Sequence, residues 1–459
     1  MNSQSKKMEL LGSTSIPKAL LAMGIPTMIG MLVNAFYNLV DAYFVGGLGE
    51  SQMGAISVVY PLGQVVVGLG LLFGNGAASY ISRLLGRGDK ENADKVASTA
   101  LYSSVSVGAV IIIISMVFLH PILKLLGATD SILPFAATYA GIYIVSCIFN
   151  VFNVTMNNIV TSEGAAKTTM CALLTGAVLN IALDPLFIYV FDLGVAGAAI
   201  ATAISQVVST CVYLTYIFRK KSVFHFRVKD CTYTKETMSE IFKIGIPTLV
   251  FQILTSVSIS LINNAAGDYG DSAIAGMGVV TRLISMGSLS VFGFIKGFQP
   301  IAGYSYGAKK FDRLREAIKT SILWSTVFCV IFGVILALFP TAIVSQFTKG
   351  DAEMIRIGVT SLRANGISIM LFGFYTVYSS LFLALGKGRE GFILGACRQG
   401  ICFIPVILLL PIVWGLNGIM YAQPIADVLS AVITVFMAIP LHKKLNEMQR
   451  KTAEISPNN

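Results

Sequence analysis

Three acidic side chains lie deep inside long apolar stretches of this sequence: Asp41, Asp184 and Asp427. A charged group at the centre of a bilayer costs about 2.5–3.5 kcal/mol or more, so an acid in a membrane-spanning segment is a functional candidate. Asn180 precedes Asp184 by four residues, which places both on one face of a helix. Thr202 lies at a similar level in the next apolar stretch. These residues are therefore candidates for binding a small cation or a proton.

The depth of the two acids in the first half of the chain favours a shared site. At 1.5 Å per helical residue, Asp41 and Asp184 both fall about 7–11 Å below the outer interface. Together with Asn180 and Thr202 they offer two carboxylates, an amide and a hydroxyl, all hard oxygen ligands. Two nearby carboxylates also raise each other's proton affinity. The same four side chains are thus predicted to hold either Na⁺ or H⁺.

Other polar side chains of the first half repeat at helical spacing. Asn34 and Tyr37 precede Asp41 by seven and four residues and share its face. The fourth apolar stretch carries a stripe of three asparagines, at Asn150, Asn153 and Asn157. Such stripes often form hydrogen-bonded seams between helices in a membrane. The pattern leaves two interpretations open for these five residues, an interhelical seam or the lining of the substrate or ion cavity.

The second half of the chain does not repeat this constellation. Asp427 lies at about the same depth as Arg282 and Arg363, counted at 1.5 Å per residue, so we expect a structural ion pair with one of them. Lys296 and Arg398 also fall in or near apolar stretches, and the sequence assigns them no role. The positions equivalent to the candidate cation site are Ile262, Ile401, Pro405 and Gln423. Ion coupling is therefore expected through the first half alone.

The elements that must position these residues are membrane-spanning helices. The 459 residues are 55% hydrophobic and only 12% charged, with a mean hydropathy of +0.76. Backbone groups inside a bilayer must be satisfied internally, so each apolar stretch is predicted to be a helix. The fold class is an all-α membrane protein with twelve transmembrane helices. The stretches are 16–46, 53–82, 96–119, 134–160, 168–191, 194–218, 241–267, 273–306, 317–340, 355–385, 391–413 and 417–441.

The chain repeats itself at an offset of 221 residues. Residues 24–27 (GIPT) return as residues 245–248, and Gly86 returns as Gly307, each before a charged loop. A unit of six helices begins and ends on one side of the membrane, so the halves are parallel repeats. The predicted domains are a first lobe at 1–218, a cytoplasmic linker at 219–240, a second lobe at 241–441 and a cytoplasmic tail at 442–459.

The distribution of basic residues predicts the orientation. Most of the 33 Lys and Arg residues lie in the two termini and in loops on one side, whereas the opposite loops hold only Lys124 and Lys349. Under the positive-inside rule both termini are cytoplasmic. No cleavable signal peptide is expected, because the first 17 residues are polar. The predicted location is a bacterial cytoplasmic (inner) membrane, with the bilayer as partner. A cysteine label at Ser222 or Ser456 would test the orientation.

Several other functions are excluded or disfavoured by the composition. The net charge of +10 is explained by basic loops, so nucleic acid is not an expected partner. The chain has neither a G-x-x-x-x-G-K-[ST] nor an H-E-x-x-H motif, so an enzyme and an ATP-driven pump are both disfavoured. The seven cysteines form no C-x-x-C pair. We expect no cofactor beyond a coupling ion.

Several motifs in order on this duplicated frame resemble the multidrug and toxic compound extrusion (MATE) transporters, in particular the bacterial MepA-like branch. The motifs are GIPT at 24–27 and 245–248, NLVD at 38–41, SRLLGRGD at 82–89, NIALDP at 180–185, GVAGAA at 194–199 and QPIAGYSYGAKK at 299–310. The resemblance covers about 16–441 and implies a V-shaped pair of bundles that alternates between inward- and outward-open states.

The same resemblance implies a function. It suggests a secondary-active antiporter, expected as a monomer, that confers antibiotic resistance by exporting amphipathic, often cationic drugs in exchange for Na⁺ or H⁺. The matching family positions give Asp41, Asn180, Asp184 and Thr202 as the cation site. A lipid-linked precursor flippase is the nearest alternative, although such proteins commonly have a more basic cavity and extra helices. An intramembrane enzyme, a receptor and a channel are further alternatives, and accumulation of a fluorescent cationic dye would discriminate among them.

Overall fold

The computed structural model describes residues 3–347 and 351–455, and every regular element within these ranges is helical. Lys349 and Ser456, which bear on the predicted orientation, lie outside the described residues. Twelve helices among the described residues are long and apolar enough to cross a membrane. The prediction of an all-α fold with twelve spanning helices is therefore confirmed.

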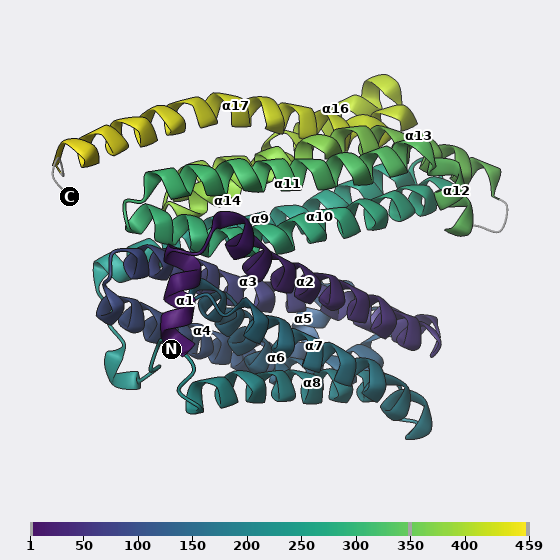
Figure 1. Cartoon of the computed structure of the whole chain (residues 1–459). Helices are drawn as coiled ribbons and strands as arrows, with labels where there is room; N and C mark the ends of the chain where they lie inside the picture. Colours follow the sequence, from purple (N-terminus) through teal and green to yellow (C-terminus); the bar gives the residue numbers. More distant parts are fainter. Residues whose placement is uncertain (1–2, 348–350, 456–459) are drawn as a thin grey trace.

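The helices form two bundles that lie side by side, one for each half of the chain (Figure 1). The spanning helices of the first lobe are α2 (Ile16–Gly46), α3 (Glu50–Gly86), α4 (Lys90–Val117), α6 (Leu133–Ser162), α7 (Ala166–Pro185) and α8 (Gly194–Phe218). Two short helices accompany them, α1 (Ser3–Gly12) and α5 (Leu119–Leu125). A π-helical turn at Leu186–Val190 extends α7.

The second lobe repeats this order with more interruptions. Its uninterrupted spans are α9 (Lys235–Gly267), α10 (Asp271–Gly307), α11 (Phe311–Leu338) and α17 (Leu416–Ile455). A 3₁₀ turn at Ile369–Leu371 separates α13 (Ala352–Ser368) from α14 (Phe372–Ala384), and a π-helical turn at Cys397–Ile401 separates α15 (Gly388–Ala396) from α16 (Phe403–Trp414). The short helix α12 spans Pro340–Val344.

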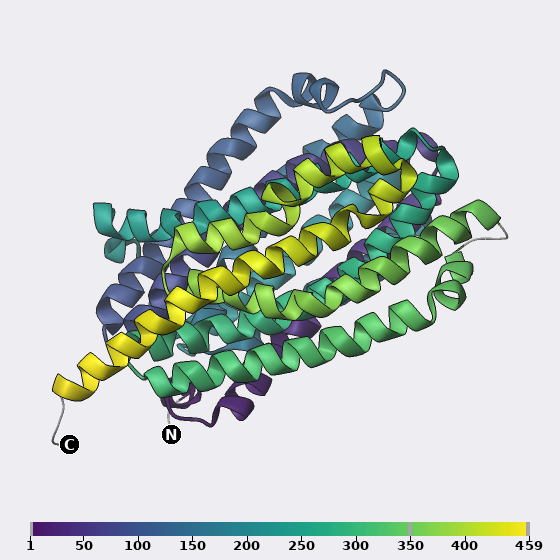
Figure 2. The ribbon, with the colours of Figure 1, turned by 90° about the horizontal axis from the view of Figure 1, so that it is seen from above.

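Two helices extend beyond the apolar stretches that predicted them. α9 begins at Lys235, inside the segment predicted as linker, where the Thr234 side chain accepts a hydrogen bond from the backbone of Thr237. α17 continues to Ile455 rather than ending near residue 441, and projects past its neighbours (Figure 2). Hydropathy detects only the part of a helix that matches the bilayer, whereas backbone hydrogen bonds continue through charged turns outside it.

The lobes cross at glycines related by the 221-residue repeat. A Cβ on Gly86 of α3 would lie 2.1 Å from the Tyr304 carbonyl oxygen of α10, and a Cβ on Gly307 of α10 would lie 2.1 Å from the Arg83 carbonyl oxygen of α3. The two contacts exchange equivalent positions, as an axis between parallel repeats requires. Arg83 also forms an ion pair of 2.6 Å with Glu240 of α9. The lobes are thus held in contact at the end that carries both termini.

Alanine at Gly307 is expected to force α3 and α10 apart, because no side chain fits against the Arg83 carbonyl. Overpacking of this kind costs about 1–3 kcal/mol, so the melting temperature should fall and spin labels on α3 and α10 should report a wider gap at this end. Gly278→Ala is the matched control, since nothing lies within 4 Å of its added Cβ on the same helix. An unchanged gap in Gly307→Ala would contradict the tight crossing.

Helix α1 was not predicted, and it contacts both lobes. Its Lys7 forms an ion pair of 3.2 Å with the buried Glu163 at the end of α6, and also donates to the carbonyl of Lys221. Towards the second lobe, Arg313 of α11 donates to the main-chain carbonyls of three residues, namely Leu10, Leu11 and Thr14. The short helix therefore bridges the two bundles at the terminus-bearing end (Figure 1).

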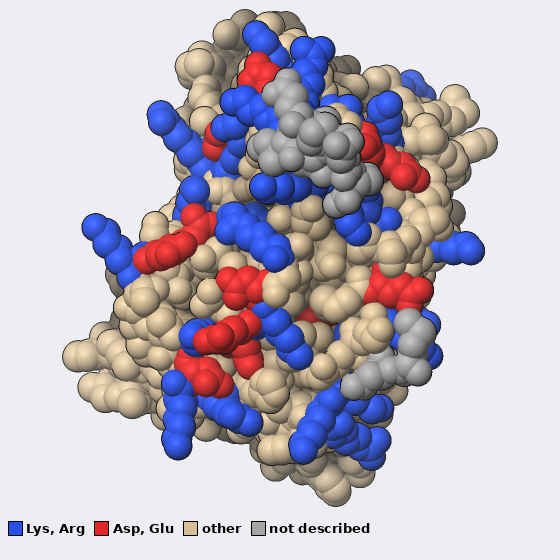
Figure 3. All heavy atoms as spheres, turned by 60° about the vertical axis from the view of Figure 1, so that its left-hand side comes forward, with Lys and Arg blue, Asp and Glu red and all other residues tan. Residues whose placement is uncertain are grey.

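Lysines and arginines gather on the terminus-bearing end of the molecule (Figure 3). This end is predicted to face the cytoplasm. Ser222 is a poor reporter because it is buried and donates to Glu163. Val228 is 68% exposed in the same linker. We expect Val228→Cys, in a background without native cysteines, to resist an impermeant thiol reagent in intact cells and to react after permeabilisation. Labelling from outside would reverse the predicted orientation.

Candidate functional site

The structure brings the four predicted cation ligands together. Asn180 on α7 donates to Asp184 Oδ1 at 3.3 Å and to the Thr202 hydroxyl of α8 at 3.5 Å. The carboxyl groups of Asp41, from α2, and Asp184 lie within hydrogen-bonding reach of each other. α7 packs against both α2 and α8, which explains how three separate helices meet at one point. The site lies wholly within the first lobe.

Three oxygen atoms of this cluster are buried and make no hydrogen bond within the described residues: Asp41 Oδ1, Asp184 Oδ2 and Asn180 Oδ1. A buried acceptor without a donor is costly, and two facing carboxylates repel one another. A cation or a proton bound between the carboxyl groups would satisfy these oxygens. The residues present therefore fit a small hard cation such as Na⁺, and equally fit a shared proton.

The backbone at this cluster departs from a regular α-helix. Pro185 directly follows Asp184, and because proline has no N–H it leaves the Ile181 carbonyl without its usual intrahelical partner. The π-helical turn at Leu186–Val190 begins at the next residue. Turns of this kind are frequent at functional sites, where they re-aim side chains. Here the irregularity lies immediately beyond the Asp184 carboxyl group.

The remaining polar residues of the first lobe have varied surroundings. Tyr37 lies beside the two carboxyl groups, whereas Asn34 is exposed. Asn153 donates at 2.9 Å to the Gln206 carbonyl of α8 and accepts at 2.9 Å from Thr210. These contacts form an interhelical seam between α6 and α8.

The five polar residues do not line the large inter-lobe cavity. Its described lining includes neither Asn34 nor Tyr37, nor any member of the predicted stripe Asn150, Asn153 and Asn157. Tyr37 instead lies beside the carboxyl groups of the candidate ion site. Asn157 instead accepts a hydrogen bond from Lys296 of the other lobe and donates to Tyr213. Asn158, the next residue, does line the cavity. A stripe with helical spacing defines a face but not the neighbour that the face meets.

The predicted partner of Asp427 is also wrong. Asp427 pairs with Arg398, whose Nε lies 3.1 Å from its Oδ1, and not with Arg282 or Arg363, which are both exposed. Depth along the membrane normal does not determine which side of a helix a residue occupies. The π-helical turn at Cys397–Ile401 contains Arg398 and changes the phase of this helix, which apolar periodicity did not reveal.

Asp427 is 1% exposed and accepts several further hydrogen bonds. Ser368 donates at 2.9 Å, Gln423 at 2.9 Å and Tyr375 at 3.3 Å. The carboxylate is thus fully paired by one cation and three neutral donors. In contrast to the first-lobe acids, neither of its oxygens is left without a donor. This arrangement has the character of a structural ion pair.

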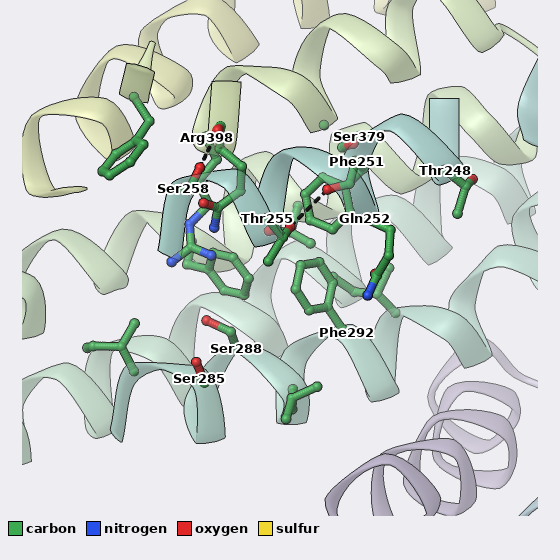
Figure 4. A pocket seen from close by; sticks show the side chains of 18 of the residues that line it. Thr248, Phe251, Gln252, Thr255, Ser258, Ser285, Ser288, Phe292, Ser379 and Arg398 are labelled. Atoms are coloured by element: carbon green, nitrogen blue, oxygen red, sulfur yellow. Dashed lines mark hydrogen bonds between the residues drawn. The ribbon is translucent and has the colours of Figure 1, made fainter. Parts of the chain in front are cut away.

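A cavity of about 560 Å³ lies between the lobes. Most of its described lining comes from the second lobe, above all from α9, α10 and α14, and a few residues of α2, α3 and α6 close the opposite side. Figure 4 shows Phe251, Phe292 and several serines and threonines around this space. The only charged side chains among its described lining residues are Lys296 and Arg398. The ion-site candidates and the cavity therefore occupy different places.

The duplicated frame corresponds to a known family model, MatE, which matches residues 26–186 and again residues 247–409. The chain belongs to the MatE family. It is accordingly a transporter and not an enzyme. The two MatE matches begin 221 residues apart, at the offset predicted from the GIPT motifs.

Similar MatE proteins include the multidrug export protein MepA of Staphylococcus aureus (strain MSSA476), 32% identical over 93% of this chain and 94% of that protein. The MepA of Staphylococcus saprophyticus is 32% identical over 94% and 95%. A solved outward-facing structure of a multidrug resistance MATE transporter is 26% identical with a TM-score of 0.90, and covers 97% of this chain and 99% of that one. A MOP superfamily transporter from Pyrococcus furiosus, described by the reverse polarity of its binding pocket, has the same identity and coverages with a TM-score of 0.89. The resemblance to the MepA-like branch is confirmed.

Proposed function

We propose that this protein is a secondary-active multidrug exporter that works as a monomer. It moves amphipathic organic compounds, organic cations among them, out of the cell in exchange for Na⁺ or H⁺. The observation that carries the proposal is the pair Asp41 and Asp184, each with one buried oxygen that has no donor, in one lobe beside a separate inter-lobe cavity. The similarity to the staphylococcal multidrug export proteins supports the substrate class.

The geometry gives each part a task in alternating access. The glycine crossings and the Arg83–Glu240 pair close the terminus-bearing end, predicted to be cytoplasmic. Asp41, Asn180, Asp184 and Thr202 would hold the coupling ion, whose positive charge offsets the repulsion between the two carboxylates. Three helices contribute to that cluster, so ion binding favours one relative position of α2, α7 and α8. A ligand shifts a conformational equilibrium by its differential affinity for the two states.

Efflux from reconstituted vesicles tests the proposal. A fluorescent amphipathic dye, used in a cationic and in a neutral form, is loaded while a Na⁺ gradient or a pH gradient is imposed separately. We expect dye movement that depends on the protein and responds to one of the two gradients. Dye movement that responds to neither gradient would contradict secondary-active antiport, and the responding gradient identifies the ion.

A further inference from the structure

The inter-lobe cavity has a positive lining. Lys296 and Arg398 face it, and no aspartate or glutamate is among its described lining residues. Arg398 is balanced by Asp427, which lies behind it rather than in the cavity wall. Lys296 has no carboxylate within ion-pair distance among the residues that the structure describes. The cavity therefore contains one more positive charge than its surroundings compensate.

The Lys296 ammonium group has N–H donors that are not used in hydrogen bonds to the protein. It donates to the Asn157 side-chain oxygen across the lobe boundary, and no other hydrogen bond from it is present within the described residues. An ammonium carries three donors, so two remain for a ligand. A cation held away from bulk water without a partner is stabilised by an anion. Lys296 thus supplies unbalanced positive potential on one side of the cavity.

Arg398 presents a free edge to the same space. Its Nε is engaged by Asp427, and its guanidinium carbon lies 4.5 Å from the ring centre of Phe372. Its two terminal nitrogens make no hydrogen bond within the described part of the chain. Because the Asp427 carboxylate already has three neutral donors, it does not need this edge. A guanidinium edge of this kind matches the oxygens of a carboxylate, phosphate or sulfonate.

Two hydroxyl groups and an aromatic surface complete the lining. Ser288 and Thr376 line the cavity, are at least nine-tenths buried, and have hydroxyls without a hydrogen-bond partner. Figure 4 places Ser288 and Arg398 around the same part of the cavity, with Phe292 beside them. The Phe292 ring packs edge-on against Phe372, at 5.3 Å between ring centres. Unpaired donors next to an aromatic face suit a ring that carries an anionic group.

We propose that this cavity binds aromatic amphipathic anions, with the anionic group at the Arg398 edge and the Ser288 hydroxyl and with Lys296 supplying the net positive charge. This proposal rests on the proposed export function and names a substrate class for it, beside the organic cations. The shared chemistry is an oxyanion on an apolar body. Its source is either a soluble compound or an anionic lipid headgroup.

The test measures binding to the purified full-length protein in nanodiscs of phosphatidylcholine. One probe is 8-anilinonaphthalene-1-sulfonate, and the other is N-phenyl-1-naphthylamine, which has the same rings without the sulfonate. We expect tighter binding of the sulfonate. Lys296→Gln and Arg398→Lys should each weaken it by roughly ten-fold, the size of one lost charge-assisted hydrogen bond. Binding of the neutral probe should not change.

Matched controls separate this site from general charge. Arg282→Gln and Arg363→Gln each remove one arginine from the same lobe, and both positions are exposed and outside the cavity lining. Arg398→Lys keeps a cation beside Asp427, and a melting curve of each variant shows that it is folded. Equal affinity of wild type for the two probes would overturn the proposal, as would an equal loss of sulfonate binding in Arg363→Gln.

Two further measurements identify the source of the anion and separate this proposal from the proposed export function. Displacement of the sulfonate by phosphatidylglycerol in the nanodisc assigns the site to a lipid headgroup, whereas displacement only by soluble naphthalene-1-sulfonate assigns it to a soluble anion. Binding is measured without any ion gradient, so it does not depend on coupling. Gradient-driven dye efflux with no preference for the sulfonate would refute this inference alone. Sulfonate binding without gradient-driven efflux would refute the proposed function alone.

Discussion

Asp41→Asn and Asp184→Asn should each leave a folded, membrane-inserted protein that no longer exports a dye in response to an ion gradient. Each change removes one of two facing carboxyl groups, each of which has one buried oxygen without a donor, so the pair loses the charge that attracts a cation or proton. Without ion binding, the gradient cannot bias the two conformations. We expect at least a ten-fold loss of gradient-driven efflux, measured in proteoliposomes together with ion binding on the same preparation.

The variants of neighbouring residues sharpen this expectation. Thr202→Ala should be milder, because it removes a neutral ligand that water can replace. Asp427→Asn is the matched control, since it neutralises a buried acid that already has a full set of donors. This variant should lower the stability of the protein and leave its response to the ion gradient unchanged. Normal ion-coupled efflux by either Asp41→Asn or Asp184→Asn would rule out the site.

Arg398→Leu should strongly destabilise the protein. It leaves Asp427, which is 1% exposed, as a buried carboxylate without a cation. Breaking a buried pair in this way costs about 3–5 kcal/mol in soluble protein interiors. The expected result is a lower melting temperature and a lower yield of inserted protein. The double variant Arg398→Leu with Asp427→Leu should recover part of the loss, because it leaves neither charge unpaired.

The opposite result for Asp427→Asn would place ion coupling in the second lobe. If Asp427→Asn melted like wild type but lost its response to the ion gradient, coupling would belong to this pair and not to the first lobe. Activity alone is a poor readout for Arg398→Leu, because Arg398 also faces the inter-lobe cavity. Thermal unfolding and recovery in the double variant are therefore the decisive measurements.

Residue spacing was sufficient to predict which groups of the first lobe meet. Asn180 and Asp184 share a face through simple helical periodicity, and depth placed Asp41 and Thr202 at their level. That they bind a cation stays a prediction. The same reasoning failed for Asp427, because depth along the membrane normal does not determine which side of a helix a residue occupies. Its partner Arg398 lies in a π-helical turn, which apolar periodicity does not reveal.

The relation between the lobes was only partly predictable. The repeat predicts that Gly86 and Gly307 occupy equivalent positions. It does not predict that each packs against the other's helix, because internal similarity carries no information on how the lobes dock. Helix α1 was not predicted because it is short and polar, whereas apolar stretches indicate only the membrane-spanning helices. Lys296 and Arg398 could be found as cations within spans, yet their shared cavity required the packing of both lobes.

Helix α1 is attached to the first lobe through its side chains and to the second lobe through its main chain. Towards the first lobe α1 is attached by its own side chains, Lys7 to Glu163 and Gln4 to the Ser222 carbonyl, whereas towards the second it offers main-chain carbonyls to Arg313 that any sequence would provide. Substitutions within α1 can therefore release the attachment to the first lobe, whereas the main-chain attachment to the second lobe is released only by a change in that lobe, at Arg313 or Lys310. With Lys7 and Gln4 replaced, we expect the N-terminal segment to stay with the second lobe. An affinity tag fused at the N-terminus is therefore not a neutral addition, because it loads the helix that ties the two bundles together.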